Sequence, residues 1–206
     1  MPNLVLASAS PRRRELLTQA GFVFSVHPAH IPEDPQPGED PIAYVTRLAR
    51  DKAQAVYREL SGAAIESPQQ DSGQRGPDGQ SLAVLGADTT VTLDGHILGK
   101  PENAIDAARM LRMLSGRTHR VITGVAVVTA NRVEVAAEVT AVQFLTMSDE
   151  EIASYVAGGE PMDKAGAYAI QGRAAKWIPR IEGCYFNVVG LPLALVNAML
   201  GVVLDS

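Results

Sequence analysis

The sequence predicts a mixed α/β domain, in which helices pack on a sheet of mixed strand direction. Three features carry this prediction. An apolar strand at residues 4–7 runs directly into a helix, strand-like and helical periodicities are mixed along the chain without strict alternation, and Asp94-Gly95 marks a two-residue hairpin. The 206 residues are 46% hydrophobic and 20% charged, which is typical of a soluble globular domain. We expect one domain over residues 1–206.

The junction between the first strand and the first helix predicts a phosphate-binding cradle. Ser8 and Ser10 end the strand, Ser10 is a typical N-cap, and Pro11 suits the first helical position. A helix that starts in this way leaves main-chain N–H groups unpaired, and these bind anions. Arg12 and Arg13 add positive charge. A run of three arginines is, however, equally typical of a solvated helix face.

The next elements follow from turns, spacing and composition. Gly21 predicts the end of the first helix, and the apolar spacing after an acidic, Pro-rich segment predicts a long helix with Lys52 beside its apolar stripe. A stretch of Gly, Ser, Pro, Gln and Asp predicts a flexible surface insertion instead of a domain boundary. In order, these are a helix at 12–20, a strand at 22–27, a helix at 42–56 and an insertion at 61–81.

The second half of the chain contains most of the predicted strands. Asp94-Gly95 joins two strands, Ser148 and Glu151 form a capping box, and the turn at Gly190 precedes the closing helix. The predicted elements are strands at 82–85 and 90–93, a return strand at 96–98, a helix at 103–114, strands at 119–129 and 133–145, a helix to Val156, a loop-rich run at 161–172, and a strand at 185–189.

Two acidic residues are candidates for chemistry. Asp88 follows the strand at 82–85 with only Gly86 and Ala87 between, so we expect its carboxylate at a strand end, where it can bind a hard cation or orient a water. Glu33 lies in a loop between two prolines, and stiff loops commonly position catalytic groups. The alternatives are a turn aspartate and a solvated acidic loop.

Other polar residues have weaker claims. Lys52 can simply cover apolar helix surface, whereas Lys100 lies between Gly99 and Pro101, where no regular element fits. His119 begins a strand, where hydrogen bonding in the core is its expected role. Gln171 lies in a segment of small residues, 163–172, that lets the backbone approach a ligand and offers an amide donor and acceptor.

Charge and cysteine content narrow the partners and the compartment. The formal net charge of −5 argues against nucleic acid, which needs a basic face, but allows a small anionic ligand. No apolar stretch is long enough for a membrane span and no targeting segment is visible. Cys184 is the single cysteine, which excludes an internal disulfide and fits a reducing cytoplasm.

Seven short motifs together resemble the Maf family of nucleoside triphosphate pyrophosphatases, over nearly the whole chain. Each motif is weak alone, but their order and spacing make the combination specific. They are SASPRR at 8–13, LARDKA at 48–53, GADT at 86–89, GKP at 99–101, SGRTHRV at 115–121, DKAGAYAIQG at 163–172 and VVGLP at 188–192. The insertion at 61–81 departs from the compact family pattern, but it lies between motifs.

The resemblance implies a twisted mixed sheet with flanking helices and a cleft between two lobes, similar to inosine triphosphatases. It also implies a cytoplasmic, often dimeric enzyme that cleaves a nucleoside triphosphate to the monophosphate and pyrophosphate with Mg²⁺ or Mn²⁺. Asp88 would be the general base or a metal-linked carboxylate, with Glu33 as its acidic partner, and both would be metal ligands. The implied triphosphate ligands are Ser8, Ser10, Arg12, Arg13, Lys52 and Lys100, and Lys52 also belongs with Asp88 and Glu33 to the implied catalytic residues.

The late motif resembles the branch of the family that acts on dTTP and UTP. The resemblance places Arg12, Thr89 and Gln171 at its substrate-selecting positions. A fixed amide can match the acceptor and donor edge of uracil or thymine and leave a buried mismatch with other bases. Two alternatives stay open: the same chemistry on 7-methyl-GTP or another noncanonical nucleotide, and a nucleotide-binding regulator of septum formation without turnover.

Overall fold

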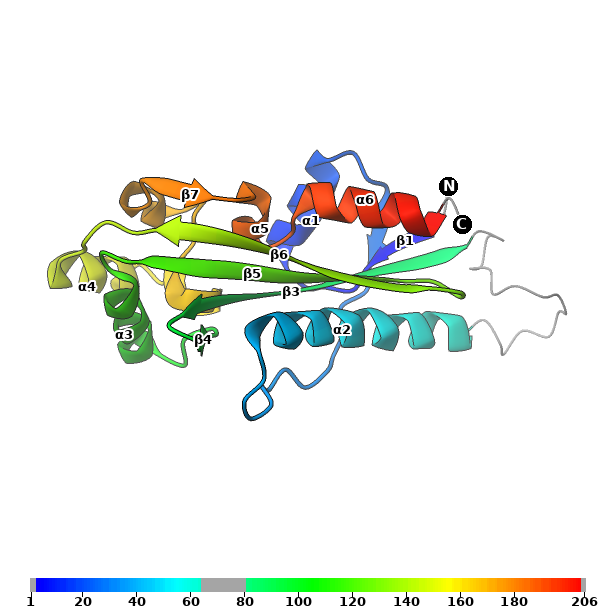
Figure 1. Cartoon of the computed structure of the whole chain (residues 1–206), viewed down its shortest axis with the longest axis horizontal. Helices are drawn as coiled ribbons and strands as arrows, with labels where there is room; N and C mark the ends of the chain where they lie inside the picture. Colours follow the sequence, from blue (N-terminus) through cyan, green and yellow to red (C-terminus); the bar gives the residue numbers. More distant parts are fainter. Residues whose placement is uncertain (1–2, 64–80, 205–206) are drawn as a thin grey trace, which may run out of the picture.

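The computed structural model describes residues 3–63 and 81–204, which form a mixed sheet with helices on both faces (Figure 1). The strands are β1 (Asn3–Leu6), β2 (Phe24–Val26), β3 (Leu82–Leu93), β4 (His96–Leu98), β5 (Thr118–Val128), β6 (Val133–Gln143) and β7 (Arg180–Glu182). The helices are α1 (Pro11–Gln19), α2 (Pro41–Ala63), α3 (Ala104–Leu114), α4 (Asp149–Ala157), α5 (Tyr185–Val189) and α6 (Leu193–Leu204), with 3₁₀ turns η1 (Glu160–Asp163), η2 (Ala165–Ala167) and η3 (Arg173–Trp177).

The strand order of the sheet is β2-β1-β3-β5-β6-β7, and β4 pairs with β3. β1 runs parallel to both β2 and β3, whereas β5, β6, β7 and β4 are all antiparallel to their partners. Long strands β3, β5 and β6 run along most of the molecule (Figure 1). The predicted mixed α/β class is therefore confirmed.

One edge of β3 is interrupted. β1 pairs with its first part, up to Leu85, and β4 pairs with its last part, from Val91. On the other edge, β5 pairs continuously with residues 84–92. Within the described part of the chain, residues 86–90 therefore have a strand neighbour on one side only. This interruption leaves space beside Asp88, which lines a cavity there.

The helices divide the core into three clusters. α2 covers one face of the sheet, α1 and α6 cover the other, and α3 and α4 close the far end (Figure 1). Ala49 and Val56 of α2 pack against β1, β3 and β5, whereas Leu17 of α1 and Val196 of α6 pack on the opposite face. Leu111 of α3 belongs to the third cluster, at the α3–α4 end. The predicted inner face of α3, which contains Ala107, Met110, Leu111 and Leu114, is buried as expected.

Two glycines let α2 lie directly against the sheet. A Cβ atom at Gly86 would lie 2.1 Å from the main-chain oxygen of Ala49, and one at Gly124 would lie 2.3 Å from that of Val45. Gly124 faces Asp88 across the β3–β5 pair. Any side chain at these positions would push the helix away, because packed interiors have no spare volume. The glycines therefore fix the height of α2 above Asp88.

Several predicted local structures are confirmed. Ser10 caps α1 by accepting a hydrogen bond from the Arg13 N–H, and Pro11 is the first helical residue. Ser148 and Glu151 form the predicted capping box at the start of α4. Asp94 and Gly95 have φ values of 51° and 80°, as the predicted tight turn between β3 and β4 requires. The predicted strand at 22–27 shortens to β2.

Two predictions about strands are wrong. Asp88 does not end a strand, because β3 continues through it and stays paired with β5 as far as Thr92. The segment 185–189 is not a strand but the short helix α5, and the strand of this region is β7. Gly183 and Gly190, with φ of 126° and 125°, turn the chain on either side of α5. A short apolar run alone does not distinguish strand from helix.

The predicted insertion at 61–81 lies mostly outside the described residues. α2 continues through residues 61–63, so the helix is longer than predicted, and residues 64–80 are not described. Across residues 3–63 and 81–204, no helix combines the length and the apolar character needed to cross a membrane.

His119 belongs to the core of the α3–α4 end, as expected. Its side chain is 2% exposed, its Nε2 lies 2.7 Å from the Tyr168 hydroxyl, and its ring contacts Phe144 edge-on. Burial lowers the pKa of His119 to about 4. The ring is therefore neutral at pH 7 and packs as an aromatic side chain.

We expect Gly124→Ala to lower the free energy of unfolding by roughly 1–3 kcal/mol, because the new methyl group forces α2 off the sheet. Urea unfolding monitored by circular dichroism measures this change. Gly201→Ala in α6 is the matched control: a Cβ atom there meets nothing within 4 Å, so we expect no loss of stability. Equal stability of the two variants would contradict the proposed contact.

His119 should make the fold sensitive to acid. Its pKa is about 4 in the folded chain and about 6.5 in an unfolded one, so the unfolded state binds more protons between these values. The contribution of the neutral His119 ring to the free energy of unfolding is fully present above about pH 6.5. It decreases by roughly 3 kcal/mol as the pH falls to 4. His119→Gln should lack this part of the loss. Urea unfolding of the wild-type protein and of His119→Gln at pH 7 and pH 4 tests this expectation. An equal loss of the free energy of unfolding in both proteins would refute it.

Candidate functional site

A cavity of about 520 Å³ lies at the interruption of β3. Its walls come from the β1–α1 loop, the middle of β3, the start of α2 and the loop before it, and the segment around η2. Of the predicted site residues, all ten line this one cavity: Ser8, Ser10, Arg12, Arg13, Glu33, Lys52, Asp88, Thr89, Lys100 and Gln171. Residues far apart in the sequence thus meet at the interruption of β3.

The centre of the site is a lysine held between two carboxylates. The Lys52 Nζ lies 2.7 Å from Asp88 Oδ1 and 2.7 Å from Glu33 Oε1. Lys52 and Asp88 are 7% and 8% exposed, whereas the Glu33 side chain is half exposed. Lys52 follows Ala49 by about one helical turn. The close contacts of Gly86 and Gly124 with α2 therefore also place Lys52 next to Asp88.

The electrostatics of Asp88 are finely balanced. Burial raises the pKa of its carboxyl group, and the nearby positive charges of Lys52 and Arg13 act against that rise. Removing a charged carboxylate from water is unfavourable unless a cation compensates it. Lys52 supplies this compensation at hydrogen-bond distance. The Asp88 carboxylate therefore accepts a hydrogen bond from a cation in a buried place, and its pKa lies above the ordinary value.

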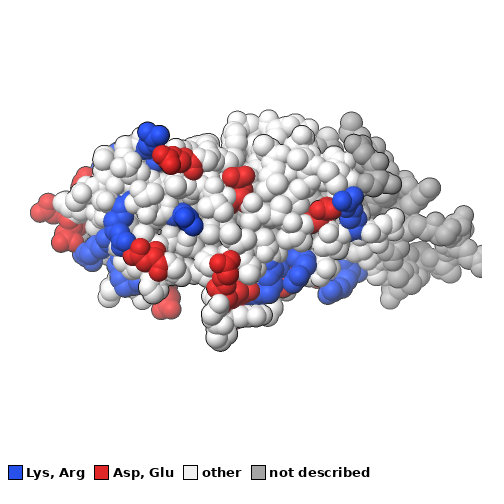
Figure 2. All heavy atoms as spheres, in the orientation of Figure 1, with Lys and Arg blue, Asp and Glu red and all other residues white. Residues whose placement is uncertain are grey.

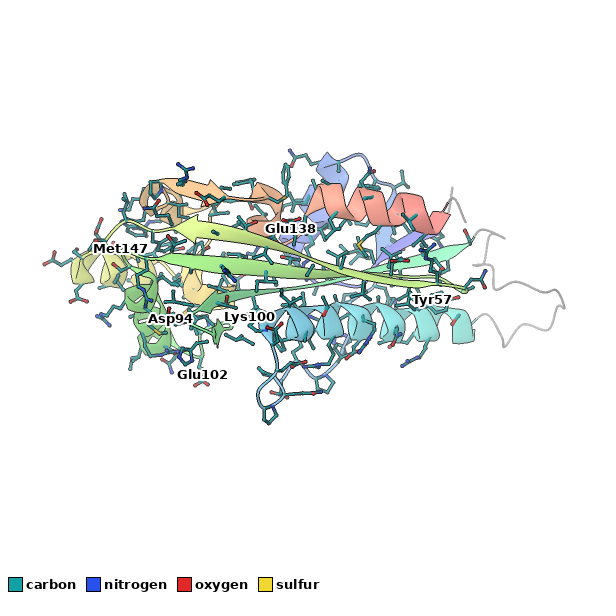
Figure 3. The ribbon with its side chains drawn as sticks, viewed as in Figure 1. Tyr57, Asp94, Lys100, Glu102, Glu138 and Met147 are labelled. Atoms are coloured by element: carbon teal, nitrogen blue, oxygen red, sulfur yellow. The ribbon has the colours of Figure 1, made fainter. Side chains whose placement is uncertain are left out.

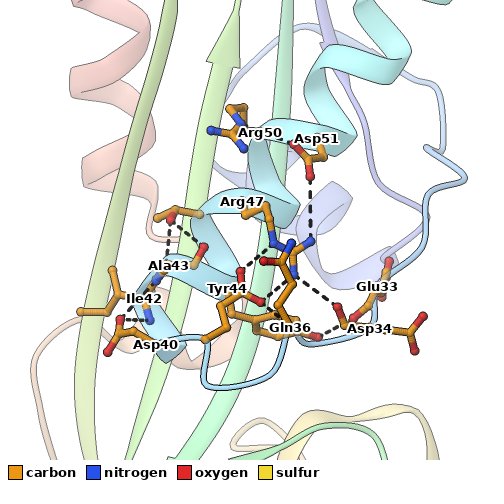
Figure 4. Close-up of polar contacts among 12 residues, drawn as sticks. Glu33, Asp34, Gln36, Asp40, Ile42, Ala43, Tyr44, Arg47, Arg50 and Asp51 are labelled. Carbon is orange, nitrogen blue, oxygen red and sulfur yellow. Dashed lines mark hydrogen bonds and ion pairs between the residues drawn. The ribbon is translucent and has the colours of Figure 1, made fainter.

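Glu33 is fixed by the first turns of α2 (Figure 4). The Tyr44 hydroxyl donates to the main-chain oxygen of Glu33 at 2.8 Å, and the Arg47 guanidinium donates to that of Asp34 at 3.2 Å. Arg47 also forms two short hydrogen bonds to the Glu39 carboxylate, at 2.6 and 2.7 Å. These contacts tie the loop to α2, so Glu33 and Lys52 are held by the same element.

The loop before α1 keeps several donors free. The Ser8 hydroxyl accepts from the Ser10 N–H, and the Ser10 hydroxyl accepts from the Arg13 N–H, so these two amides are satisfied. The N–H groups of Ser8, Ala9 and Arg12 have no hydrogen-bond partner among residues 3–63 and 81–204. All three residues line the cavity. Unpaired N–H groups at a helix N-terminus favour an anion.

Arg13 lines the cavity, but its donors are used by the protein. Its guanidinium donates to the main-chain oxygens of Gly190 at 2.9 Å and Ala87 at 2.8 Å, and to the hydroxyls of Ser8 at 3.2 Å and Thr89 at 3.0 Å. One side chain thus joins the first loop, β3 and the turn after α5. The hydroxyl of Thr89 is also shared with Thr123 at 2.9 Å.

The remaining predicted cations are more available. Arg12 makes one long ion pair with Asp163, at 3.5 Å. Lys100, which is labelled in Figure 3 and follows β4, forms no ion pair with any residue that the structure describes. The Gln171 side chain is exposed and likewise makes no hydrogen bond to a described residue. These three side chains are free to contact a ligand.

The cavity differs in charge from the rest of the molecule. Its described lining holds five Lys or Arg side chains and three carboxylates, although the whole chain carries a net charge of −5. On the face shown in Figure 2, positive and negative side chains are interspersed and neither sign forms a continuous patch. The positive potential is therefore local, which suits a small polyanion better than a nucleic acid.

Glu33 and Asp88 fit a divalent cation as partial ligands. Their carboxylate oxygens approach the same point, which the Lys52 ammonium occupies. Among the described residues, no group of three or more His, Cys, Asp or Glu side chains could hold a metal ion by itself. Mg²⁺ is typically bound by one or two carboxylates together with substrate phosphates, so a two-carboxylate site is sufficient when a phosphate ligand is present.

Sequence reasoning missed Tyr44, which lines the cavity and holds Glu33. Tyr44 lies eight residues before Lys52, so helical spacing would have placed both on one face of α2. Arg173 does not line the cavity, and its guanidinium donates to Ser154 instead. Cys184 is partly buried and lies outside the lining.

Comparison with known proteins adds independent information. The family of Maf-like proteins matches residues 3–203. The dTTP/UTP pyrophosphatase of Koribacter versatilis (strain Ellin345) is 53% identical over 197 residues, covering 96% of this chain and 92% of the relative. The dTTP/UTP pyrophosphatase of Geobacter sulfurreducens is 51% identical over 195 residues, covering 94% and 92%, and that of Chromobacterium violaceum is 48% identical over 191 residues, covering 92% and 89%.

Proposed function

Because this chain belongs to the Maf family, we propose that it hydrolyses dTTP and UTP to the nucleoside monophosphate and pyrophosphate. The observation that carries the proposal is the Glu33–Lys52–Asp88 cluster, which lies in one cavity with a helix N-terminus that has unpaired N–H groups. The cluster provides a base, and the helix N-terminus provides an anion site. The names of the relatives support the pyrimidine substrates.

Asp88 acts as the general base in this proposal. Its carboxylate accepts a proton from the water that attacks the α-phosphorus, and burial raises its pKa toward the range in which a base is effective. Lys52 favours the ionised form of the carboxylate and holds it in one orientation. Because β3 is paired with β5 along this stretch, Asp88 has little freedom to move, and the attack geometry is set in advance.

The triphosphate occupies the positive part of the cavity. The N–H groups of Ser8, Ala9 and Arg12 face developing negative charge, and the Arg12 and Lys100 side chains add charged donors. Ser10 holds the start of α1, which keeps these donors aligned. Arg13 holds the same loop against β3 through its hydrogen bonds to Ser8 and Thr89.

Glu33 and Asp88 would hold a divalent cation together with the phosphates. When bound, Mg²⁺ or Mn²⁺ neutralises negative charge on the phosphate oxygens. Lys52 supplies a positive charge between the same two carboxylates, so it keeps them from repelling each other before substrate arrives. This arrangement fits the general metal dependence of nucleotide pyrophosphatases.

Gln171 and Thr89 select the base. The free Gln171 amide offers one donor and one acceptor, which match the edge that uracil and thymine share. Thr89 is already held by Arg13 and Thr123, so its position is fixed. A different base would leave a buried donor or acceptor unpaired, which is unfavourable by roughly 1–3 kcal/mol for each lost hydrogen bond.

Asp88→Asn should lower kcat on UTP by roughly 10²- to 10⁴-fold, because the amide cannot accept the proton, while nucleotide affinity changes little. Pyrophosphate release with Mg²⁺ and calorimetric binding of the nucleotide measure the two quantities. Glu150→Gln, in the first turn of α4 and outside the cavity lining, is the matched control. Normal turnover in Asp88→Asn would remove Asp88 from this role.

The same assay with wild-type protein tests the substrate class across a panel of canonical triphosphates and 7-methyl-GTP. We expect dTTP and UTP to give the highest kcat/KM. Preference for 7-methyl-GTP would refute the pyrimidine assignment but keep the chemistry. Absence of turnover on every triphosphate would refute both and favour a non-catalytic nucleotide-binding protein.

Gln171→Ala should change selectivity more than rate. We expect the ratio of kcat/KM for UTP to that for CTP to fall roughly tenfold or more, because the hydrogen bonds that distinguish the two bases are lost. The kcat on UTP should change far less, since Asp88 is untouched. Steady-state kinetics on both nucleotides measure the ratio, and an unchanged ratio would contradict the assignment of Gln171.

A further inference from the structure

Gln171 lies at the centre of a turn that other residues hold in place. The turn, residues 169–173, is closed by a hydrogen bond from the Gly172 N–H to the Ala169 oxygen, at 3.1 Å. The side chain of Gln171 is exposed and contributes nothing to the described hydrogen bonds of the turn. The position of the Gln171 backbone, from which its amide extends, therefore depends on what fixes the two ends of the turn.

Tyr155 and Glu160 bind both ends. The Ala169 N–H donates to the Tyr155 hydroxyl at 3.2 Å, and the Arg173 N–H donates to the two Glu160 carboxylate oxygens at 3.1 and 3.2 Å. The Tyr155 hydroxyl in turn donates to Glu160 Oε1 at 2.7 Å. Four groups thus form a continuous chain of hydrogen bonds that spans the turn, with Gln171 at its middle.

The groups of this network are closely packed. A Cβ atom at Gly172 would lie 2.0 Å from Glu160 Oε1, so the carboxylate lies directly against the backbone of the turn. Tyr155 is fully buried, and its ring packs edge-on against Trp177 with ring centres 5.4 Å apart. Burial raises the pKa of Tyr155, so its hydroxyl remains a donor to Glu160. The Tyr155 end of the network is therefore buried and closely packed, whereas the hydrogen bonds from the Arg173 N–H lie at the surface.

We propose that Tyr155 and Glu160 are positioning residues for base discrimination: they fix the turn that carries Gln171 and thereby set which pyrimidine the site accepts. The inference rests on the proposed function. Neither residue lines the cavity, so neither touches the nucleotide, and both act through Gln171. Asp88, Glu33 and Lys52 come from β3, α2 and its preceding loop, so the reacting end does not depend on this network.

The expected consequence is a loss of selectivity with little loss of turnover. A fixed amide presents one donor and one acceptor, and a base with the wrong pattern meets an unpaired group. If the turn loosens, the amide can move away from a mismatched base, and the penalty against that base falls. Preorganised groups also bind more tightly, so KM for the preferred base should rise.

Tyr155→Phe and Glu160→Gln test the inference, since both keep the size of the side chain. We expect each variant to lower the UTP to CTP ratio of kcat/KM by about fivefold or more, with kcat on UTP within about twofold of wild type. Tyr185→Phe and Glu150→Gln, which remove the same groups outside the network, should leave the ratio unchanged. If Glu160→Gln does not fold, Tyr155→Phe decides alone, because it retains the ring packing.

Combination with Gln171→Ala separates positioning from general disturbance. If Tyr155 acts through Gln171, Tyr155→Phe should lower the ratio no further in a Gln171→Ala protein. The inference would be overturned if the UTP to CTP ratio fell further in the double variant than in Gln171→Ala alone. It would also be overturned if Tyr155→Phe and Glu160→Gln both kept the wild-type ratio. A wild-type protein that prefers UTP over CTP while these variants keep that preference refutes this inference alone. A wild-type protein that cleaves neither UTP nor dTTP refutes the proposed function and this inference together.

Discussion

The close approach of α2 to the sheet is the constraint on which the rest of the site depends. Gly86 and Gly124 leave room for the helix backbone, and Gly124 lies directly across from Asp88. Because the helix is this close, Lys52 reaches a carboxylate that the strand has buried. The first turns of the same helix hold the loop of Glu33. One packing contact thus sets the spacing of the whole cluster.

The cluster also shows why a buried charge is tolerable here. An isolated Asp88 carboxylate would be strongly unfavourable inside the protein, and removing one partner of a buried ion pair is far more damaging than removing both. Lys52 offsets the burial, while Arg13, whose guanidinium is held by four protein acceptors, adds positive charge nearby. The stability of the buried carboxylate therefore depends on the same few side chains to which the proposed function assigns its chemistry.

Local patterns in the sequence predicted most of the fold. The features that depend on contacts between residues distant in the sequence were not predicted. The Ser10 cap, the Asp94-Gly95 turn and the inner face of α3 depend on neighbouring residues, so they were predicted correctly. The path of β3 through Asp88 depends on pairing with β5, and the helical form of α5 depends on packing between two glycine turns. Composition cannot reveal such contacts. The resemblance supplied the predicted site residues, but it did not indicate that Tyr44 holds the loop of Glu33.

An early and a late segment of the sequence meet at the cavity, because the Arg13 guanidinium donates to the Gly190 oxygen and residues 188–190 complete the lining. Protein synthesis delivers these partners at opposite times. A nascent chain emerging from the ribosome has α1 early but cannot close the cavity until residues 188–190 have also emerged. Fragments shortened before Gly190 would lack one wall, so the cavity can be complete only after this turn has been synthesised.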